Sequence, residues 1–195
     1  MTKKFGFDID GVLTAEGRGK NNIWKNYLEK FLGRPVQLKK NSYDFAQAYD
    51  ISRETLELFL EAYLSDIYFN VLPAPDAKKV LKKLREYNCM IFLITARDEE
   101  YKSLTEKWLL KHSLPYDRLI HDDDKACRAT DCGLDLFVDD KTENIIELSR
   151  AGIDTLIYER HHNKDLSREF YLSRVKNWRK IEKIIDRTFL DLGRR

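Results

Sequence analysis

The sequence has few cysteines, no long hydrophobic run and no signal-peptide core. Only three of its 195 residues are cysteines and they form no C-x-x-C pair, so we expect reduced thiols rather than a disulfide framework. The longest apolar stretch, Cys89 to Ile94, is far shorter than the roughly 20 residues that cross a bilayer. Lys3 and Lys4 lead within a few residues to Asp8, which leaves no room for a hydrophobic leader. These absences predict a cytoplasmic protein with no membrane partner.

The chain also lacks an excess of charge of one sign. Its 35 Lys and Arg residues face 33 Asp and Glu residues, for a net charge of +2, whereas a dedicated duplex-DNA binder needs a large basic excess. We therefore expect no stable binding to nucleic acid. With 43% hydrophobic and 12% aromatic residues the chain can bury a core, so disorder is excluded as its main state. Its length fits one domain with a modest insertion.

Short apolar runs alternate with amphipathic stretches along the chain. The runs predicted to be buried strands are 5–9, 89–94, 119–120, 134–138 and 153–158, followed by a short strand at 174–175. Helices are predicted after Asp76 and Asp98, which we interpret as caps, from Thr142 to Gly152, and over 178–189. Buried strands separated by helices predict an α/β fold, a doubly wound, Rossmann-like parallel sheet with right-handed crossovers.

One segment, residues 14–73, breaks this alternation. It shows helix signals over 22–32 and 52–64, and it contains 10 of the 23 aromatic residues. Pro73 and Pro75 mark the return to the alternating pattern. We predict a small helical cap over 14–73, inserted after the first strand, and a core formed by 1–13 and 74–195. At helical spacing most cap aromatics are expected to pack with one another, and others could stack on a base.

Polar side chains end three of the predicted strands. Asp8 and Asp10 follow the first, Thr95 ends another, and Asp139 and Asp140 end a third. The carboxyl ends of parallel strands meet at one edge of a sheet, which is where such folds bind ligands. Clustered carboxylates repel and raise each other's pKa values, so a cation is the natural partner that keeps them ionised. An all-oxygen ligand set favours Mg²⁺ over zinc, and Mg²⁺ commonly accompanies phosphate.

A turn, a helix cap or a surface lysine would explain each of these residues alone, but the combination resembles the haloacid dehalogenase superfamily of aspartate-nucleophile phosphatases. The matching motifs are FDIDGVLT at 7–14, FLITAR at 92–97, Lys125, and FVDD at 137–140. The resemblance covers roughly residues 3–160. Within the superfamily, the place of the cap and the run TARD at 95–98 are similar to the 5′(3′)-deoxyribonucleotidase-like group, including its uncharacterised bacterial branch. The better-known nucleotidases carry Ser-Pro where this chain has Ala96-Arg97.

The resemblance implies a role for each carboxylate. Asp8 would be the nucleophile, and Asp10 the general acid and then the general base. Two residues apart on one strand, both side chains would point to the same face. Mg²⁺ would be bound by Asp8, by the backbone carbonyl of Asp10, and by Asp139 or Asp140, a choice the sequence leaves open.

The resemblance also implies a phosphate-binding set. Thr95, with backbone N–H groups at Ala96 and Arg97, would bind the oxygens that are not transferred, and Lys125 would neutralise charge on the nucleophile and the phosphoryl group. Lys141 competes with Lys125 for that role. The Arg97 side chain is either a phosphate or substrate contact or an exposed arginine at a helix start.

Together these features predict a Mg²⁺-dependent phosphomonoester hydrolase that works through an aspartyl-phosphate. Its expected partner is a small phosphorylated substrate, a 5′- or 3′-nucleotide first. The alternatives are a 3′-phosphatase on nucleic-acid ends, a phosphatase of another small metabolite, and a non-catalytic phosphometabolite-binding protein. The sequence is also compatible with a homodimer.

Overall fold

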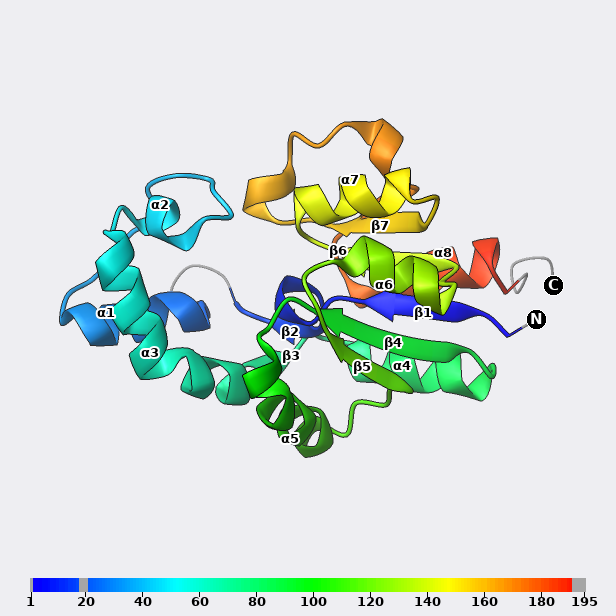
Figure 1. Cartoon of the computed structure of the whole chain (residues 1–195), viewed down its shortest axis with the longest axis horizontal. Helices are drawn as coiled ribbons and strands as arrows, with labels where there is room; N and C mark the ends of the chain where they lie inside the picture. Colours follow the sequence, from blue (N-terminus) through cyan, green and yellow to red (C-terminus); the bar gives the residue numbers. More distant parts are fainter. Residues whose placement is uncertain (1, 18–20, 191–195) are drawn as a thin grey trace.

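Six strands form one parallel sheet at the centre of the computed structural model, which describes residues 2–17 and 21–190. They are β1 (Lys4–Phe7), β4 (Met90–Thr95), β5 (Arg118–His121), β6 (Leu136–Asp139), β7 (Asp154–Tyr158) and β8 (Ser173–Val175). Their order across the sheet is β5-β4-β1-β6-β7-β8, and every neighbouring pair is parallel (Figure 1). Because β1 lies inside the sheet and the chain extends it on both sides, the predicted doubly wound α/β fold is confirmed.

Helices cover both faces of this sheet. On one face lie α4 (Ala77–Glu86), α5 (Lys102–His112) and α8 (Trp178–Thr188), and on the other α6 (Lys125–Cys132) and α7 (Thr142–Arg150). On the first face the ring of Phe7 stacks on Trp178, with ring centroids 5.0 Å apart, and Trp108 is fully buried nearby. On the second face Phe137 packs so closely over Gly6 that a Cβ there would lie 2.3 Å from its ring. Burial of these large rings stabilises the sheet that positions the site.

The predicted cap leaves the sheet edge and returns to it through a two-stranded antiparallel ribbon, β2 (Thr14–Ala15) and β3 (Leu72–Pro73). Between these strands lie α1 (Ile23–Leu32), α2 (Phe45–Tyr49) and α3 (Arg53–Asn70). They stand beyond the carboxyl ends of the sheet strands (Figure 1). The division into core and cap stays a prediction, and we keep the name cap for residues 14–73. Residues 1, 18–20 and 191–195 of this division lie outside the described residues.

The helix expected over 52–64 continues as α3 to Asn70. Two contacts with α5 account for the extra length. Lys111 Nζ donates to the Phe69 carbonyl oxygen at 3.1 Å, and Trp108 Nε1 donates to the Val71 carbonyl oxygen at 2.7 Å. The end of α3 is therefore fixed by the core, a contact that helical periodicity does not reveal.

Two aspartates predicted to cap helices, Asp76 and Asp98, make no capping hydrogen bond with their side chains. Asp76 precedes α4, but its backbone is left-handed (φ 65°) and its carboxylate pairs with Arg179 at 2.8 Å instead of bonding to the helix. Asp98 makes no capping bond because a short turn, Glu99–Tyr101, separates it from α5. The sequence prediction also omits α2 and α6, both short helices with a capping aspartate, such as Asp124 before α6.

Most cap aromatics pack with one another, as expected. Those in the cap's own apolar cluster are Trp24, Tyr27, Phe31, Phe45, Tyr49, Phe59 and Tyr63. The other three contact the core. Tyr43 packs edge-on against His162, Tyr68 against Arg97, and Phe69 beneath Lys111. These three side chains therefore mark where the cap meets the core.

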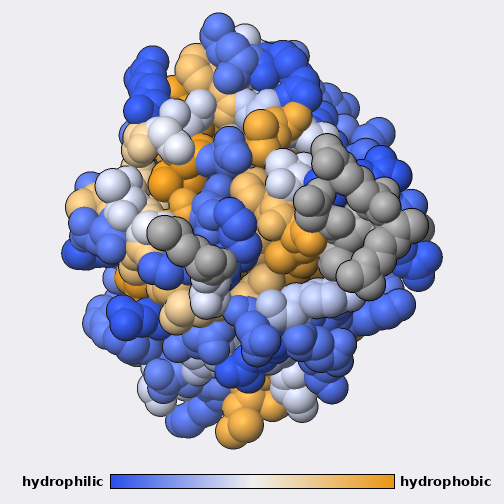
Figure 2. Space-filling view, turned by 90° about the vertical axis from the view of Figure 1, so that its right-hand side faces the viewer, coloured by the Kyte–Doolittle hydropathy of each residue, from blue (hydrophilic) through white to orange (hydrophobic). Residues whose placement is uncertain are grey.

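The end of the molecule away from the cap has hydrophobic side chains near its centre, surrounded by hydrophilic ones (Figure 2). β1 begins at this end, so the carboxyl ends of the parallel strands point the other way, toward the cap (Figure 1). None of the helices within residues 2–17 and 21–190 has the length and hydrophobicity that crossing a membrane requires.

Candidate active site

The site begins where β1 ends. The strand stops at Phe7 rather than at residue 9, so Asp8 and Asp10 lie on a tight turn beyond it and not on one strand as predicted. Asp8 N still donates to the Val138 carbonyl oxygen at 3.0 Å, and the Asp8 carboxylate accepts from Ile9 N at 2.8 Å. These bonds fix the Asp8 side chain over the sheet edge, whereas Asp10 (φ −76°, ψ 127°) is carried on the turn.

Three carboxylates come together at this edge. Oxygens of Asp8, Asp139 and Asp140 lie within 4.8 Å of one another, and these residues are 6%, 0% and 5% exposed. Burial raises the pKa of Asp8 well above its ordinary value; Lys125 opposes this, and the neighbouring carboxylates add to it. Oxygen-only donors at this spacing fit a divalent cation, which would relieve the repulsion among them. The carboxylate of Asp10 is not part of the trio.

Lys125, at the first turn of α6, lies between two of these carboxylates. Its Nζ is 2.8 Å from Asp8 Oδ1 and 2.8 Å from Asp139 Oδ2. Burial alone would lower the pKa of Lys125, but Asp139 and Asp8 raise it above its ordinary value. Lys141, the competing lysine, instead places its Nζ 5.2 Å from the centre of the Tyr43 ring. A permanent positive charge therefore contacts the predicted nucleophile.

Three of the predicted phosphate-binding residues, Thr95, Ala96 and Arg97, lie at the carboxyl end of β4, which ends at Thr95. Thr95 is 1% exposed and its Oγ1 accepts from Arg97 N at 3.3 Å, while Ala96 is exposed. The Arg97 side chain donates from Nε and Nη2 to the two oxygens of Asp10, each at 2.7 Å. The alternative of an exposed arginine is wrong, because Arg97 is only 4% exposed beneath Tyr68 of the cap.

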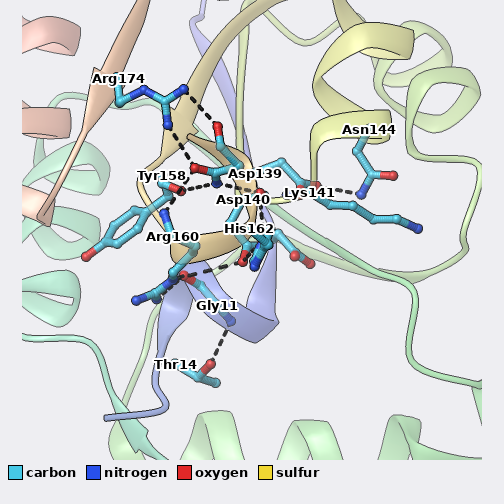
Figure 3. Close-up of polar contacts among 12 residues, drawn as sticks. Gly11, Thr14, Asp139, Asp140, Lys141, Asn144, Tyr158, Arg160, His162 and Arg174 are labelled. Atoms are coloured by element: carbon cyan, nitrogen blue, oxygen red, sulfur yellow. Dashed lines mark hydrogen bonds and ion pairs between the residues drawn. The ribbon is translucent and has the colours of Figure 1, made fainter. Parts of the chain in front are cut away.

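Sequence reasoning missed a group of residues that surround Asp140 (Figure 3). Arg160 donates from Nε to the Gly11 carbonyl oxygen at 2.9 Å, and His162 Nε2 lies 3.4 Å from Asp140 Oδ2. Asn163 Nδ2 donates to the Asp140 carbonyl oxygen at 2.7 Å. These residues follow β7, so the rule that ligands lie beyond the carboxyl ends of parallel strands could have found them.

Two further side chains near the cluster were not expected. Asn144, in the first turn of α7, donates to Asp139 Oδ2 at 3.0 Å. Glu16 follows β2 at the start of the cap, where burial and the charge of Asp140 raise its pKa to about 7 against the opposing charge of Arg160. Neither belongs to a strand-end motif, so only the tertiary structure brings them to the site.

The charges of the described site suit an anion once a cation is bound. Leaving aside Glu16 and His162, four carboxylates (Asp8, Asp10, Asp139 and Asp140) are accompanied by three cationic side chains (Lys125, Arg97 and Arg160), which leaves one negative charge among these seven side chains. A divalent cation would make the net charge +1, and Lys141 lies nearby on the rim. Such a balance would suit a phosphate dianion.

Comparison with known proteins decides the family. The family described as "5′ nucleotidase, deoxy (Pyrimidine), cytosolic type C protein" matches residues 3–189. The chain belongs to this family. A nucleotidase of Clostridium acetobutylicum is 29% identical over 188 residues, which cover 93% of each chain. The protein is therefore a hydrolase of the haloacid dehalogenase superfamily, as the motifs predict.

Solved structures show the same fold at low sequence identity. A haloacid dehalogenase-like hydrolase from Streptococcus pneumoniae has a TM-score of 0.69 at 16% identity and covers 94% of this chain and 98% of its own. A hydrolase of the same superfamily from Deinococcus radiodurans, solved with bound phosphate and sodium, has a TM-score of 0.71 at 16% identity over 95% and 96% of the two chains. These likenesses confirm the fold.

Gly11 in this nucleotidase-family site offers a direct test of packing at the cluster. Its φ of 80° is strained for other residues, and a Cβ there would lie 2.4 Å from Asp140 Oδ2. Gly11→Ala should lower the free energy of unfolding by about 1–2 kcal/mol, because alanine is strained in the left-handed region. Its Cβ should also displace Asp140. Gly152→Ala is the matched control, with φ 80° and nothing within 4 Å of its Cβ.

We expect both variants to lower the free energy of unfolding, measured by urea denaturation, but only Gly11→Ala to lose most of its phosphatase activity while still folded. Equal activity of the two folded variants would show that Asp140 need not be held where the structure places it.

Proposed function

We propose that the enzyme hydrolyses nucleoside or deoxynucleoside 5′- or 3′-monophosphates through an aspartyl-phosphate on Asp8. The observation that carries this proposal is the position of Asp8, a buried carboxylate that shares Lys125 with Asp139 and lies within the three-carboxylate cluster. A cationic partner on one side and a cation site on the other suit a nucleophile that must approach a phosphate dianion.

The reaction takes two displacements. Asp8 attacks phosphorus, the ester P–O bond breaks, and the leaving oxygen takes a proton from the Asp10 carboxylic acid, giving an alcohol and the aspartyl-phosphate. A water oxygen then attacks phosphorus and gives a proton back to Asp10, the P–O bond to Asp8 breaks, and inorganic phosphate leaves. Thr95 and the backbone N–H groups at Ala96 and Arg97 bind the oxygens that are not transferred, and Lys125 stays protonated throughout.

Mg²⁺ is the proposed cofactor, and we assign Asp140 rather than Asp139 as the second carboxylate ligand beside Asp8. Asp139 already accepts three hydrogen bonds, from Lys125 and Asn144 at Oδ2 and from Lys141 N at Oδ1. Among the residues that the structure describes, the Asp140 carboxylate has only longer contacts, to His162 at 3.4 Å and Arg160 at 4.0 Å. The backbone carbonyl of Asp10 would complete the protein ligands. Bound Mg²⁺ would neutralise charge between the phosphate and the carboxylates.

The cap supports a nucleotide as the substrate. Tyr43 is 56% exposed, and its ring packs edge-on at 5.1 Å from His162, which itself contacts Asp140. An exposed ring at the rim of the cluster can stack on a base while the phosphate lies at Asp8. The names of the family and of its relative from Clostridium acetobutylicum point to the same substrate class.

A panel of phosphate esters tests the proposal. With Mg²⁺ present, the protein should release phosphate from nucleoside 5′- or 3′-monophosphates with a kcat/KM at least about tenfold above that for sugar phosphates and 3′-phosphorylated oligonucleotides. Tenfold corresponds to about 1.4 kcal/mol of extra transition-state binding, which one stacked ring can supply. The measurement is phosphate release, with Asp8→Asn as the blank.

Each other outcome of the panel assigns a different function. Preference for phosphorylated oligonucleotides would favour the 3′-phosphatase, and preference for sugar phosphates another small metabolite. Phosphate binding without release would favour a non-catalytic binding protein. The cytoplasmic location, the absence of stable nucleic-acid binding and the homodimer remain predictions.

A further inference from the structure

We propose that Arg97 and Tyr68 form a positioning pair that ties the direction of the Asp10 carboxylate to the cap. The proposal rests on the proposed function, because it concerns the proton that Asp10 supplies to the leaving group. It gives Arg97 a role different from the phosphate contact that the sequence suggests.

All three side-chain nitrogens of Arg97 donate hydrogen bonds to oxygens of the protein. Nε and Nη2 donate to the two Asp10 oxygens, each at 2.7 Å, and Nη1 donates to Thr105 Oγ1 of α5 at 3.3 Å. The Arg97 side chain is 1% exposed, whereas that of Asp10 is 30% exposed. A two-point bond from a planar guanidinium fixes both the place and the plane of a carboxylate. Asp10 is thereby kept outside the trio of Asp8, Asp139 and Asp140 while remaining partly exposed.

Tyr68 belongs to cap helix α3 and covers the same guanidinium. The Arg97 Cζ lies 3.8 Å from the centre of the Tyr68 ring, a close cation–π contact. Tyr68 also packs edge-on against Tyr101 of the core, with ring centroids 5.4 Å apart. Because α5 supports Arg97 from one side and the cap covers it from the other, a displaced cap would free Arg97 and, with it, Asp10.

The dependence of rate on the leaving group distinguishes this role from others. An alkoxide leaving group, as in a nucleotide, needs the proton of Asp10, whereas 4-nitrophenolate is stable enough to leave without one. The guanidinium itself supplies no proton, because arginine does not deprotonate in proteins. Loss of Arg97 should therefore affect only esters that need an acid. The ratio kcat/KM is the correct readout, since it ends with departure of the leaving group and omits hydrolysis of the aspartyl-phosphate.

The experiment compares a nucleoside monophosphate, chosen from the panel, with 4-nitrophenyl phosphate in the full-length protein with Mg²⁺. For Arg97→Met we expect kcat/KM to fall about 100-fold on the nucleotide and less than about threefold on the aryl ester. Arg97→Lys should recover part of the loss, and Tyr68→Leu should show a weaker form of the same pattern. Arg85→Met is the control, because Arg85 also pairs with an aspartate, Asp117, but in the last turn of α4 with its side chain 50% exposed.

Three outcomes would overturn the proposal. Parallel loss on both esters, with weaker inhibition by inorganic phosphate, would make Arg97 a phosphate ligand. Unchanged or increased rates on the nucleotide would show that the pair does not aid proton transfer. A normal nucleotide rate in Tyr68→Leu would remove the link to the cap, and this half-buried variant remains informative if Arg97→Met does not fold. Failure of the proposed function is separate, since the wild-type protein would then show no preference for nucleotides in the panel before any variant is made.

Discussion

Replacing Asp8 by asparagine is expected to abolish turnover while leaving the fold intact. The amide is nearly isosteric with the carboxylate, and its Oδ1 can still accept from Lys125 Nζ and Ile9 N, the two partners of Asp8 Oδ1 at 2.8 Å. The amide is a poor nucleophile, however, so no aspartyl-phosphate can form. We expect kcat to fall by at least about 10³-fold. Phosphate release measures turnover, and circular dichroism shows whether the variant is folded. Mass spectrometry of the trapped intermediate shows whether the aspartyl-phosphate forms.

The same substitution should stabilise the metal-free protein at neutral pH. The pKa of Asp8 is raised in the folded state, so its ionisation costs stability as the pH rises from the unfolded value of about 3.9 toward the folded value. The neutral amide of the variant carries no such cost. In EDTA the melting temperature of Asp8→Asn should therefore exceed that of the wild type at pH 7, and the gap should narrow near pH 4. Asp66→Asn, an exposed aspartate on α3, is the control and should change neither property.

If folded Asp8→Asn keeps near wild-type turnover, the covalent route is wrong and the cluster serves another mechanism. Turnover lost together with the fold would leave the nucleophile untested in that variant, and the trapped intermediate of the wild-type protein then decides.

Removal of the metal is expected to cost nearly all activity, and only Mg²⁺ should restore it fully. In the proposed site Asp8 and Asp140 supply oxygen ligands from buried positions beside Asp139. So few protein ligands leave room for phosphate and water in the near-octahedral arrangement that Mg²⁺ requires. Ca²⁺ takes more ligands at longer distances, so it should bind but misplace Asp8 relative to phosphorus. A displacement of about 1 Å can cost on the order of a hundredfold in rate.

The measurement is phosphate release by EDTA-treated protein after addition of Mg²⁺, Ca²⁺ or no metal, with the melting temperature recorded in parallel. Both metals should raise the melting temperature, because each relieves repulsion among the carboxylates, but activity should separate them. Full activity without metal, or equal activity with Ca²⁺, would refute the proposed cation site.

The sequence by itself determined the α/β sheet and the places where its strands end. Buried parallel strands are continuous apolar runs, so the chain shows them directly, and the residues just beyond them must share one edge of the sheet. Asp8, Thr95 and Asp139 could therefore be placed together from the order of apolar runs alone. The family resemblance likewise indicated that Lys125 approaches from a separate loop, whereas the structure places it at the first turn of α6, a helix that the sequence prediction omits.

Only the tertiary structure decided what each site residue contacts. The choice of Lys125 over Lys141 as the neighbour of Asp8 depends on the start of α6, and the pairing of Arg97 with Asp10 depends on a turn and a cap helix far apart in the sequence. Such contacts arise from packing between elements, whereas periodicity and motif spacing report only which face of each element is buried. A charged residue after a strand predicts that a site exists, and its partners follow from the fold.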